Sequence, residues 1–166
     1  MENLYKELRS FFANDMDLND LFDSEAIIWI DWREYDEDVV NYFNDMMDEP
    51  IEIEIVSNGK PYGDDIVLKN GDKELQIPYG DEQDRDVTIK YFNDFVQPDY
   101  EVRWFAESLG NDTLGFTVLS GAEWANLEDE FGADTVRYYF EPINLESNMF
   151  NLGTDEVFAL LALRES

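Results

Sequence analysis

Carboxylates are the side chains of this sequence whose number and spacing could support chemistry. The chain has 40 Asp and Glu residues but neither His nor Cys. It therefore lacks the commonest general base, the commonest zinc ligands and the thiol nucleophile. Paired carboxylates can hydrolyse glycosides, yet among 40 acids such pairs arise in any fold and identify no active site. The residue types predict a non-enzymatic protein without a cofactor.

One segment begins like a calcium-binding loop. Asp15, Asp17 and Asn19 have the spacing of the first three ligands of an EF-hand. That loop also requires glycine at its sixth position and a bidentate Glu at its twelfth, where this chain has Asp20 and Ala26. We therefore interpret these acids as a solvated helix end, and we predict no metal site.

The spacing of the acids favours imitation of a nucleic-acid backbone. Carboxylates three or four residues apart on a helix are about 5–6 Å from one another, and alternate residues of a strand recur at about 6.6 Å. These separations approximate those of successive phosphates along a nucleic-acid strand. The rows that form the predicted partner-binding site are Asp36, Glu37, Asp38, Asp45, Asp48 and Glu49, then Glu52 and Glu54, then Asp81, Glu82, Asp84 and Asp86.

The net charge predicts what kind of partner such rows of acids would bind. With 11 Lys and Arg, the formal charge is −29 over 166 residues, and acids exceed bases in every third of the chain. A negative field of this size repels nucleic acid and anionic membranes and attracts basic surfaces. The expected partner is a basic nucleic-acid-binding protein, which is built to bind polyanions. We expect no direct binding of nucleic acid or membrane.

Apolar content separates this chain from two other kinds of acidic protein. It is 44% apolar, with 12 Phe, 9 Tyr and 4 Trp, whereas disordered acidic tails lack aromatics. Halophile proteins tend to be poor in large apolar residues. We therefore predict a folded protein and place most aromatics in its core: Trp29, Trp32, Tyr42, Phe43, Tyr91, Phe92, Trp104, Phe105, Tyr138 and Phe140.

Hydrophobic periodicity predicts the elements that would position the acids. The fold class is α+β, an antiparallel sheet of hairpins or a meander with three to four helices on one face. Residues 157–163 fit a final strand or a short helix. A capping box at Ser120 and Glu123 opens one helix. The predicted helices cover 4–12, 36–47, 87–96 and 122–131, and residues 18–22 fit a further short helix. The predicted strands cover 26–32, 51–55, 66–68, 74–77, 100–102, 114–119 and 135–140, with turns at 57–59, 70–71 and 110–112. In the strand 51–55, Ile51, Ile53 and Ile55 form the expected buried face, and Glu52 and Glu54 form the acidic one.

The sequence also contains a short internal repeat. The tetrapeptide that starts at Tyr42, Tyr-Phe-Asn-Asp, recurs at Tyr91. Both copies are followed by Pro, an alternating segment and a turn, which predicts a duplicated αββ unit over 36–69 and 85–119 within a single domain, 1–166. The absence of cysteine and of long apolar runs predicts a soluble protein in the cytoplasm.

In size, charge, lack of His and Cys, and aromatic content, the chain resembles the acidic DNA-mimic inhibitors of phages and mobile elements, the anti-CRISPR and antirestriction proteins. The resemblance implies an inhibitor that occupies the DNA site of a defence nuclease, for example the Arg-lined PAM pocket or basic channel of a Cas9-type enzyme. An immunity protein that neutralises a basic nuclease toxin would use the same electrostatics and remains an alternative. A mimic that sequesters a histone-like protein or a transcription factor is a third class.

Overall fold

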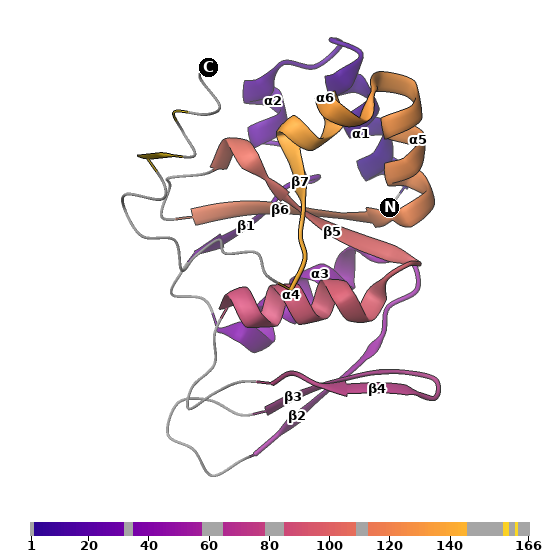
Figure 1. Cartoon of the computed structure of the whole chain (residues 1–166), viewed down its shortest axis with the longest axis vertical. Coiled ribbons are helices and arrows are strands. Elements are labelled where there is room, and N and C mark those ends of the chain that lie inside the picture. The colour runs from indigo at the N-terminus through magenta and orange to yellow at the C-terminus, as the bar shows by residue number, and fades with distance from the viewer. Residues whose placement is uncertain are drawn as a thin grey trace.

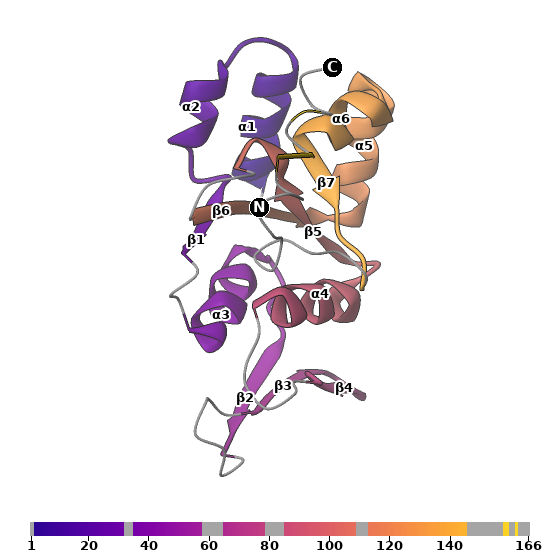
Figure 2. The same ribbon diagram turned by 60° about the vertical axis from the view of Figure 1, so that its left-hand side comes forward.

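Four layers of secondary structure are stacked along the long axis of the molecule (Figures 1 and 2). The structure is a computed structural model of the chain that describes residues 2–31, 35–57, 65–78, 85–108, 113–145, 158–159 and 162. From the top of Figure 1, the layers are a group of helices, a four-stranded sheet, a pair of helices and a three-stranded sheet.

The uppermost layer contains helices from both ends of the described chain: α1 (Glu2–Phe12), α2 (Leu18–Phe22), α5 (Gly121–Phe131) and α6 (Ala133–Tyr139). Their apolar faces form one core cluster with the upper face of the four-stranded sheet. Leu8, Leu21, Trp124 and Phe140 are among its fully buried side chains. Burial of these large side chains holds the N-terminal helices against the C-terminal ones.

The four-stranded sheet is antiparallel, with strand order β1 (Ile28–Asp31), β6 (Thr113–Ser120), β5 (Tyr100–Phe105) and β7 (Phe140–Pro142). Helices cover both of its faces, and the central strand β6 is buried from Leu114 to Leu119. A strand buried on both faces needs apolar residues at consecutive positions, which explains its continuous apolar run. A short 3-10 helix, Ala106–Ser108, follows β5.

The lower layers contain the acidic elements. Helices α3 (Asp36–Met46) and α4 (Arg85–Val96) pack between the four-stranded sheet and the meander of β2 (Glu52–Val56), β3 (Asp65–Asn70) and β4 (Lys73–Gln76). A second core cluster joins these layers, and Phe43, Phe92 and Phe116 meet within it. Among the described residues, no helix is both long and apolar enough to cross a bilayer.

The predicted α+β class with antiparallel sheets is confirmed. The meander is present, and its second hairpin turns at Gly71, whose φ of 61° suits glycine. The predicted capping box is also formed, with the Glu123 N–H donating to Ser120 Oγ at 3.1 Å and the Ser120 N–H to Glu123 Oε1 at 3.0 Å. The described residues form six α-helices, on both faces of the four-stranded sheet, where three to four on one face had been expected.

The predicted strand 135–140 is wrong. Residues Ala133–Tyr139 form helix α6, and only Phe140–Pro142 is extended. Gly132, with a φ of 96°, ends α5 and lets the chain reverse into a new helix. In that helix Val136 is buried and Tyr139 packs edge-on against Phe11 at 4.9 Å, so tertiary packing outweighs the β propensity of Thr135 and Val136.

Three predictions of burial are also wrong. Ile55 was expected on a buried strand face but is 39% exposed, because β2 is an edge strand of the outermost layer. Tyr42 and Tyr138 were expected in the core, and both are exposed. Helical periodicity alone does not distinguish the centre of an apolar face from its margin.

Both predicted repeat units contain a helix followed by an antiparallel hairpin, α3-β2-β3 in one and α4-β5-β6 in the other. The two hairpins belong to different sheets. Duplication itself stays a prediction. The predicted turns at 58–59 and 110–112, the core assignment of Trp32 and most of the segment 157–163 lie outside the described residues.

Candidate protein-binding surface

Helix α3 positions the first predicted row of acids. Val39, Val40 and Phe43 are fully buried and fix one face of the helix against the core. Its first turn carries Asp36, Glu37 and Asp38, where negative side chains interact favourably with the helix dipole. Apart from Asp36, the polar residues of α3 are therefore at least partly accessible to solvent.

The predicted acids on α3 and β2 are mostly accessible. Glu37 and Asp38 are half-buried, and the other five are exposed: Asp45, Asp48, Glu49, Glu52 and Glu54. The backbone N–H of Glu49 donates to the phenol oxygen of Tyr100 at 3.0 Å, which anchors the connection between α3 and β2. We call Glu37, Asp38, Asp45, Asp48, Glu49, Glu52 and Glu54 the α3–β2 acidic surface.

Two of the predicted site residues lie inside the protein. Asp36 is 2% exposed and Asp86 is 1% exposed. Asp36 accepts a hydrogen bond from Thr88 Oγ1 at 2.7 Å, so its carboxylate joins α3 to α4 and cannot meet a partner. These two residues are therefore removed from the predicted interface. Asp81, Glu82 and Asp84 lie outside the described residues.

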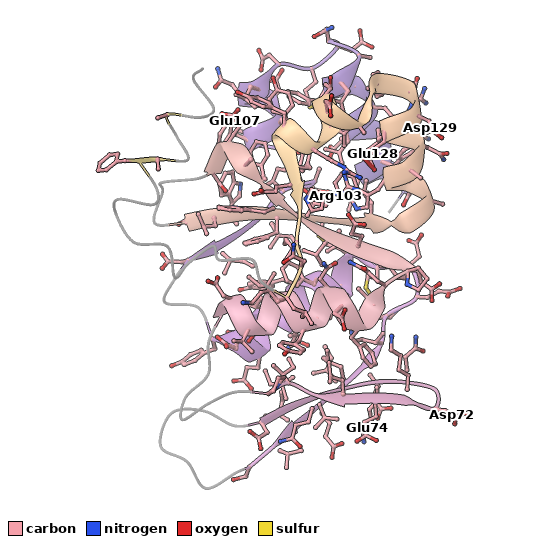
Figure 3. The ribbon with its side chains drawn as sticks, viewed as in Figure 1. Asp72, Glu74, Arg103, Glu107, Glu128 and Asp129 are labelled. Atoms are coloured by element: carbon pink, nitrogen blue, oxygen red, sulfur yellow. The ribbon has the colours of Figure 1, made fainter. Side chains whose placement is uncertain are left out.

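The strand register adds an acid that the sequence reasoning missed. Across the meander, Glu52 is opposite Lys69, and Lys69 is opposite Glu74, so the three side chains share the outer face. Figure 3 shows Glu74 and Asp72 on this outermost layer. The alternation Glu74-Leu75-Gln76 indicated a strand, but the sequence alone did not align it with Glu52.

One base lies within this outer face. Lys69 Nζ is 2.5 Å from a carboxylate oxygen of Glu54. This hydrogen bond and the charge of Glu54 raise the pKa of Lys69 above its ordinary value. Glu54 is therefore partly neutralised, while Glu52 and Glu74 keep the outer face negative.

Several of the remaining bases pair with acids of the upper layer. Arg103 is almost completely buried between β5 and α5, where it contacts Glu101 and donates to Glu128 Oε1 at 3.1 Å (Figure 3). Its guanidinium carbon lies 4.5 Å from the centre of the Trp124 ring, a cation–π contact. Arg137 also donates to Glu128, at 2.8 Å.

These bonds determine the ionisation of Glu128. Burial acts to raise its pKa, but the hydrogen bonds and charges of Arg103 and Arg137 outweigh burial and lower the pKa below its ordinary value. On the same helix, a bidentate hydrogen bond from Arg9 lowers the pKa of Glu130. Glu128 and Glu130 of α5 are thus bound by arginines and Glu123 by the backbone of the capping box, whereas Asp129 lies on the outer side of the helix (Figure 3).

The α3–β2 acidic surface is different in this respect. Within the described part of the chain, no ion pair engages Glu37, Asp38, Asp45, Glu49 or Glu52. Bases occur in both halves of the molecule, including Lys69 and Lys73 in the meander, and exposed acids also lie on the upper layer, for example Asp23 and Asp129. What distinguishes the α3–β2 acidic surface is its run of accessible carboxylates on two consecutive elements, which favours a basic partner there.

The predicted EF-hand-like segment has a structural explanation. Asp17 is the N-cap of α2, and its Oδ1 accepts from the backbone N–H of Asp20 at 2.8 Å. Across the described residues, no three acidic side chains converge as a potential metal site. The capping role accounts for the Asp17 side chain without a bound ion.

Two pockets in the described part of the structure are large enough for a small molecule. One, of about 430 Å³, lies between α4 and the segment after β7, and Asp94 is the carboxylate in its lining. The other, of about 360 Å³, lies beside α1, and its carboxylates are Asp15 and the Arg9-bound Glu130. Neither pocket offers two unpaired carboxylates of the kind that a glycosidase needs.

Comparison of the chain with models of protein families, with curated proteins and with solved structures found no match in any of the three. What the protein binds is therefore inferred from its own residues.

Proposed function

We propose that this protein is a non-enzymatic DNA mimic that binds the nucleic-acid-binding surface of a bacterial defence nuclease and blocks DNA binding. The nuclease would be a Cas9-type or restriction enzyme, and the complex would form in the cytoplasm of the bacterial cell. The accessible carboxylates of the α3–β2 acidic surface would take the places of DNA phosphates.

One observation carries this proposal: accessible carboxylates that no base neutralises follow one another along α3 and β2. Among the described residues, Asp45, Glu49 and Glu52 are exposed and belong to no ion pair. Glu128 and Glu130 of α5, in contrast, are bound by arginines. A basic cleft could therefore pair with the carboxylates of α3 and β2 directly.

The physical mechanism is competition between two polyanions for one basic site. Long-range attraction between the −29 chain and a basic cleft accelerates encounter. The backbone of α3 and β2 is already ordered, so binding loses little backbone entropy there. DNA and the mimic would then exclude each other from the cleft.

The test is a competition assay with three enzymes: a Cas9-type nuclease loaded with guide RNA, a type I restriction enzyme and the DNase domain of a bacterial toxin. Labelled duplex DNA is bound to each enzyme, and the protein is titrated while DNA release is followed by fluorescence anisotropy. We expect release from a defence nuclease, reversal by excess DNA, and no change in anisotropy when the protein meets DNA alone.

Each other outcome contradicts the proposal in a different way. Inhibition that excess DNA does not reverse would indicate an allosteric or catalytic mechanism. Inhibition restricted to the toxin DNase would favour the immunity function instead. Direct binding of the protein to DNA would exclude mimicry.

A further inference from the structure

Two exposed tyrosines alternate with aspartates along the solvent side of α3. Tyr35, Asp38, Tyr42 and Asp45 follow one another at intervals of three, four and three residues, which places neighbours on the same side of a helix. The buried side is formed by Val39, Val40 and Phe43. The solvent side of α3 therefore carries a mixed row of rings and carboxylates.

The exposure of these rings is high for residues beside a well-packed core. Tyr35, the N-cap residue of α3, is 70% exposed, and Tyr42 is 38% exposed. Most of the Tyr35 side chain and a smaller part of the Tyr42 side chain are therefore accessible to a partner. Exposed tyrosines within a binding surface are a residue type on which affinity commonly concentrates.

The net charge of the chain restricts which molecules can bind over this row of rings and carboxylates. A second copy of the chain would bring together two bodies of charge −29, and nucleic acid is repelled by the same field. A cationic protein surface is attracted to it. Between the two cationic side chains, arginine has a planar guanidinium that stacks on aromatic rings and binds carboxylates through two parallel hydrogen bonds, whereas lysine is a compact, strongly hydrated charge.

We propose that the Tyr35–Asp38–Tyr42–Asp45 row of α3 is an arginine-docking surface. Guanidinium groups of the partner stack on Tyr35 and Tyr42 and pair with Asp38 and Asp45. This inference rests on the proposed function, because it names the side chains through which the acidic surface selects its partner. It adds selectivity for arginine over lysine, which the acids alone would not supply.

The test uses two fluorescein-labelled peptides, one with alternating arginine and glycine and one with lysine in place of arginine. The variants are Tyr35→Ser, Tyr42→Ser and the double change, with Tyr35→Phe/Tyr42→Phe as the variant that keeps the rings. Tyr138→Ser on α6 is the matched control, because Tyr138 is 43% exposed and lies on another layer. Circular dichroism confirms that each variant is folded.

We expect the double serine variant to bind the arginine peptide at least about fivefold more weakly, because it loses two exposed cation–π contacts. Binding of the lysine peptide should change by less than about twofold, and the phenylalanine variant should bind as the wild type. The inference is overturned if the affinity for both peptides falls equally or if Tyr138→Ser weakens binding as much as the double serine variant does. It is also overturned if the wild type does not bind the arginine peptide.

A charge variant separates this inference from the proposed function. Asp45→Asn/Glu49→Gln/Glu52→Gln should weaken binding of both peptides. If it does so while the tyrosine variants bind normally, the acidic surface stands and the arginine-docking surface is wrong. If it leaves both peptides bound as before, the acidic surface itself is misplaced.

Discussion

Asn44 and Asn93 occupy equivalent positions in the two Tyr-Phe-Asn-Asp segments, and each side-chain amide binds the backbone near the start of the hairpin that follows. Asn44 bonds to Ile51 twice, accepting from its N–H at 2.7 Å and donating to its carbonyl oxygen at 2.9 Å. Asn93 accepts from the N–H of Val102 at 2.8 Å and donates to the carbonyl oxygen of Ile143 at 2.9 Å. The similarity favours duplication, and the difference in partners shows how the second unit is tied to the segment after β7.

Replacement of Asn93 by alanine should therefore destabilise the protein strongly. Asn93, Val102 and Ile143 are all buried, so the change leaves a buried donor and a buried acceptor without partners. Each such group costs about 1–3 kcal/mol, so the two together predict a loss of about 2–6 kcal/mol in the free energy of unfolding. Urea unfolding followed by tryptophan fluorescence measures it.

Asn44→Ala is the matched comparison. Its bonds to Ile51 are only partly buried, so water can replace them, and a loss of about 1 kcal/mol is expected. A larger loss in Asn44→Ala than in Asn93→Ala would contradict the arrangement of hydrogen bonds described above.

The pairing of Glu128 predicts a specific sensitivity to acid. Its folded-state pKa lies below the ordinary value of 4.5, so the stability that it contributes is complete above that value and is lost as the pH falls through the lowered pKa. Between roughly pH 5 and 3, the free energy of unfolding of Glu128→Gln should therefore fall less steeply than that of the wild type. Urea titrations at a series of pH values give both slopes.

Asp129→Asn is the control for that experiment, since Asp129 is the exposed neighbour of Glu128 and has no ion pair among the described residues. Its slope should match that of the wild type. Equal slopes for Glu128→Gln and the wild type would show that Arg103 and Arg137 do not hold the Glu128 carboxylate in solution.

The sequence predicted those elements whose own residues carry a complete signal. The strand β2, the apolar face of α3 and the Ser120–Glu123 capping box were predicted from local patterns, and the structure contains all three. The alternation in β2 did not determine burial, because Ile55 is exposed on an edge strand. The prediction of a strand over residues 135–140 failed because β propensity is a weak, local preference. Gly132 and the packing of Tyr139 on Phe11 determine the conformation instead.

Only part of the candidate site was predicted from the sequence, and the reason that the rest was missed is related. Acid types and spacing are visible in the sequence, but burial is a tertiary property. Asp36 falls in a row of acids, yet its bond to Thr88 spans 52 positions of the chain. The pairing of Arg103 with Glu128 and the alignment of Glu74 with Glu52 through Lys69 are equally non-local, so neither was predicted.

Added salt should stabilise the fold. Net charge far from zero destabilises a compact state through self-repulsion, and the Debye length falls from about 10 Å at 0.1 M to about 3 Å at 1 M salt. For a chain of charge −29, we expect the melting temperature to rise by several degrees between low and moderate NaCl. A falling melting temperature in a calorimetric scan would mean that pairs such as Arg9–Glu130 outweigh the repulsion.

Charge neutralisation should locate the interface. Asp45→Asn/Glu49→Gln/Glu52→Gln keeps the shape of the α3–β2 acidic surface and removes three accessible charges. Once a target nuclease is in hand, its affinity for this variant should fall by at least about tenfold, which requires only about 1.4 kcal/mol. The association rate and its dependence on salt should both decrease, because peripheral charges act mainly on encounter. Surface plasmon resonance at two salt concentrations measures all three quantities.

The control, Asp23→Asn/Glu25→Gln/Asp129→Asn, removes the same charge from exposed acids of the upper layers. Because both variants lose the same net charge, an equal effect would mean that only total charge matters. A larger effect of the control would place the binding face on the helices α1, α2, α5 and α6.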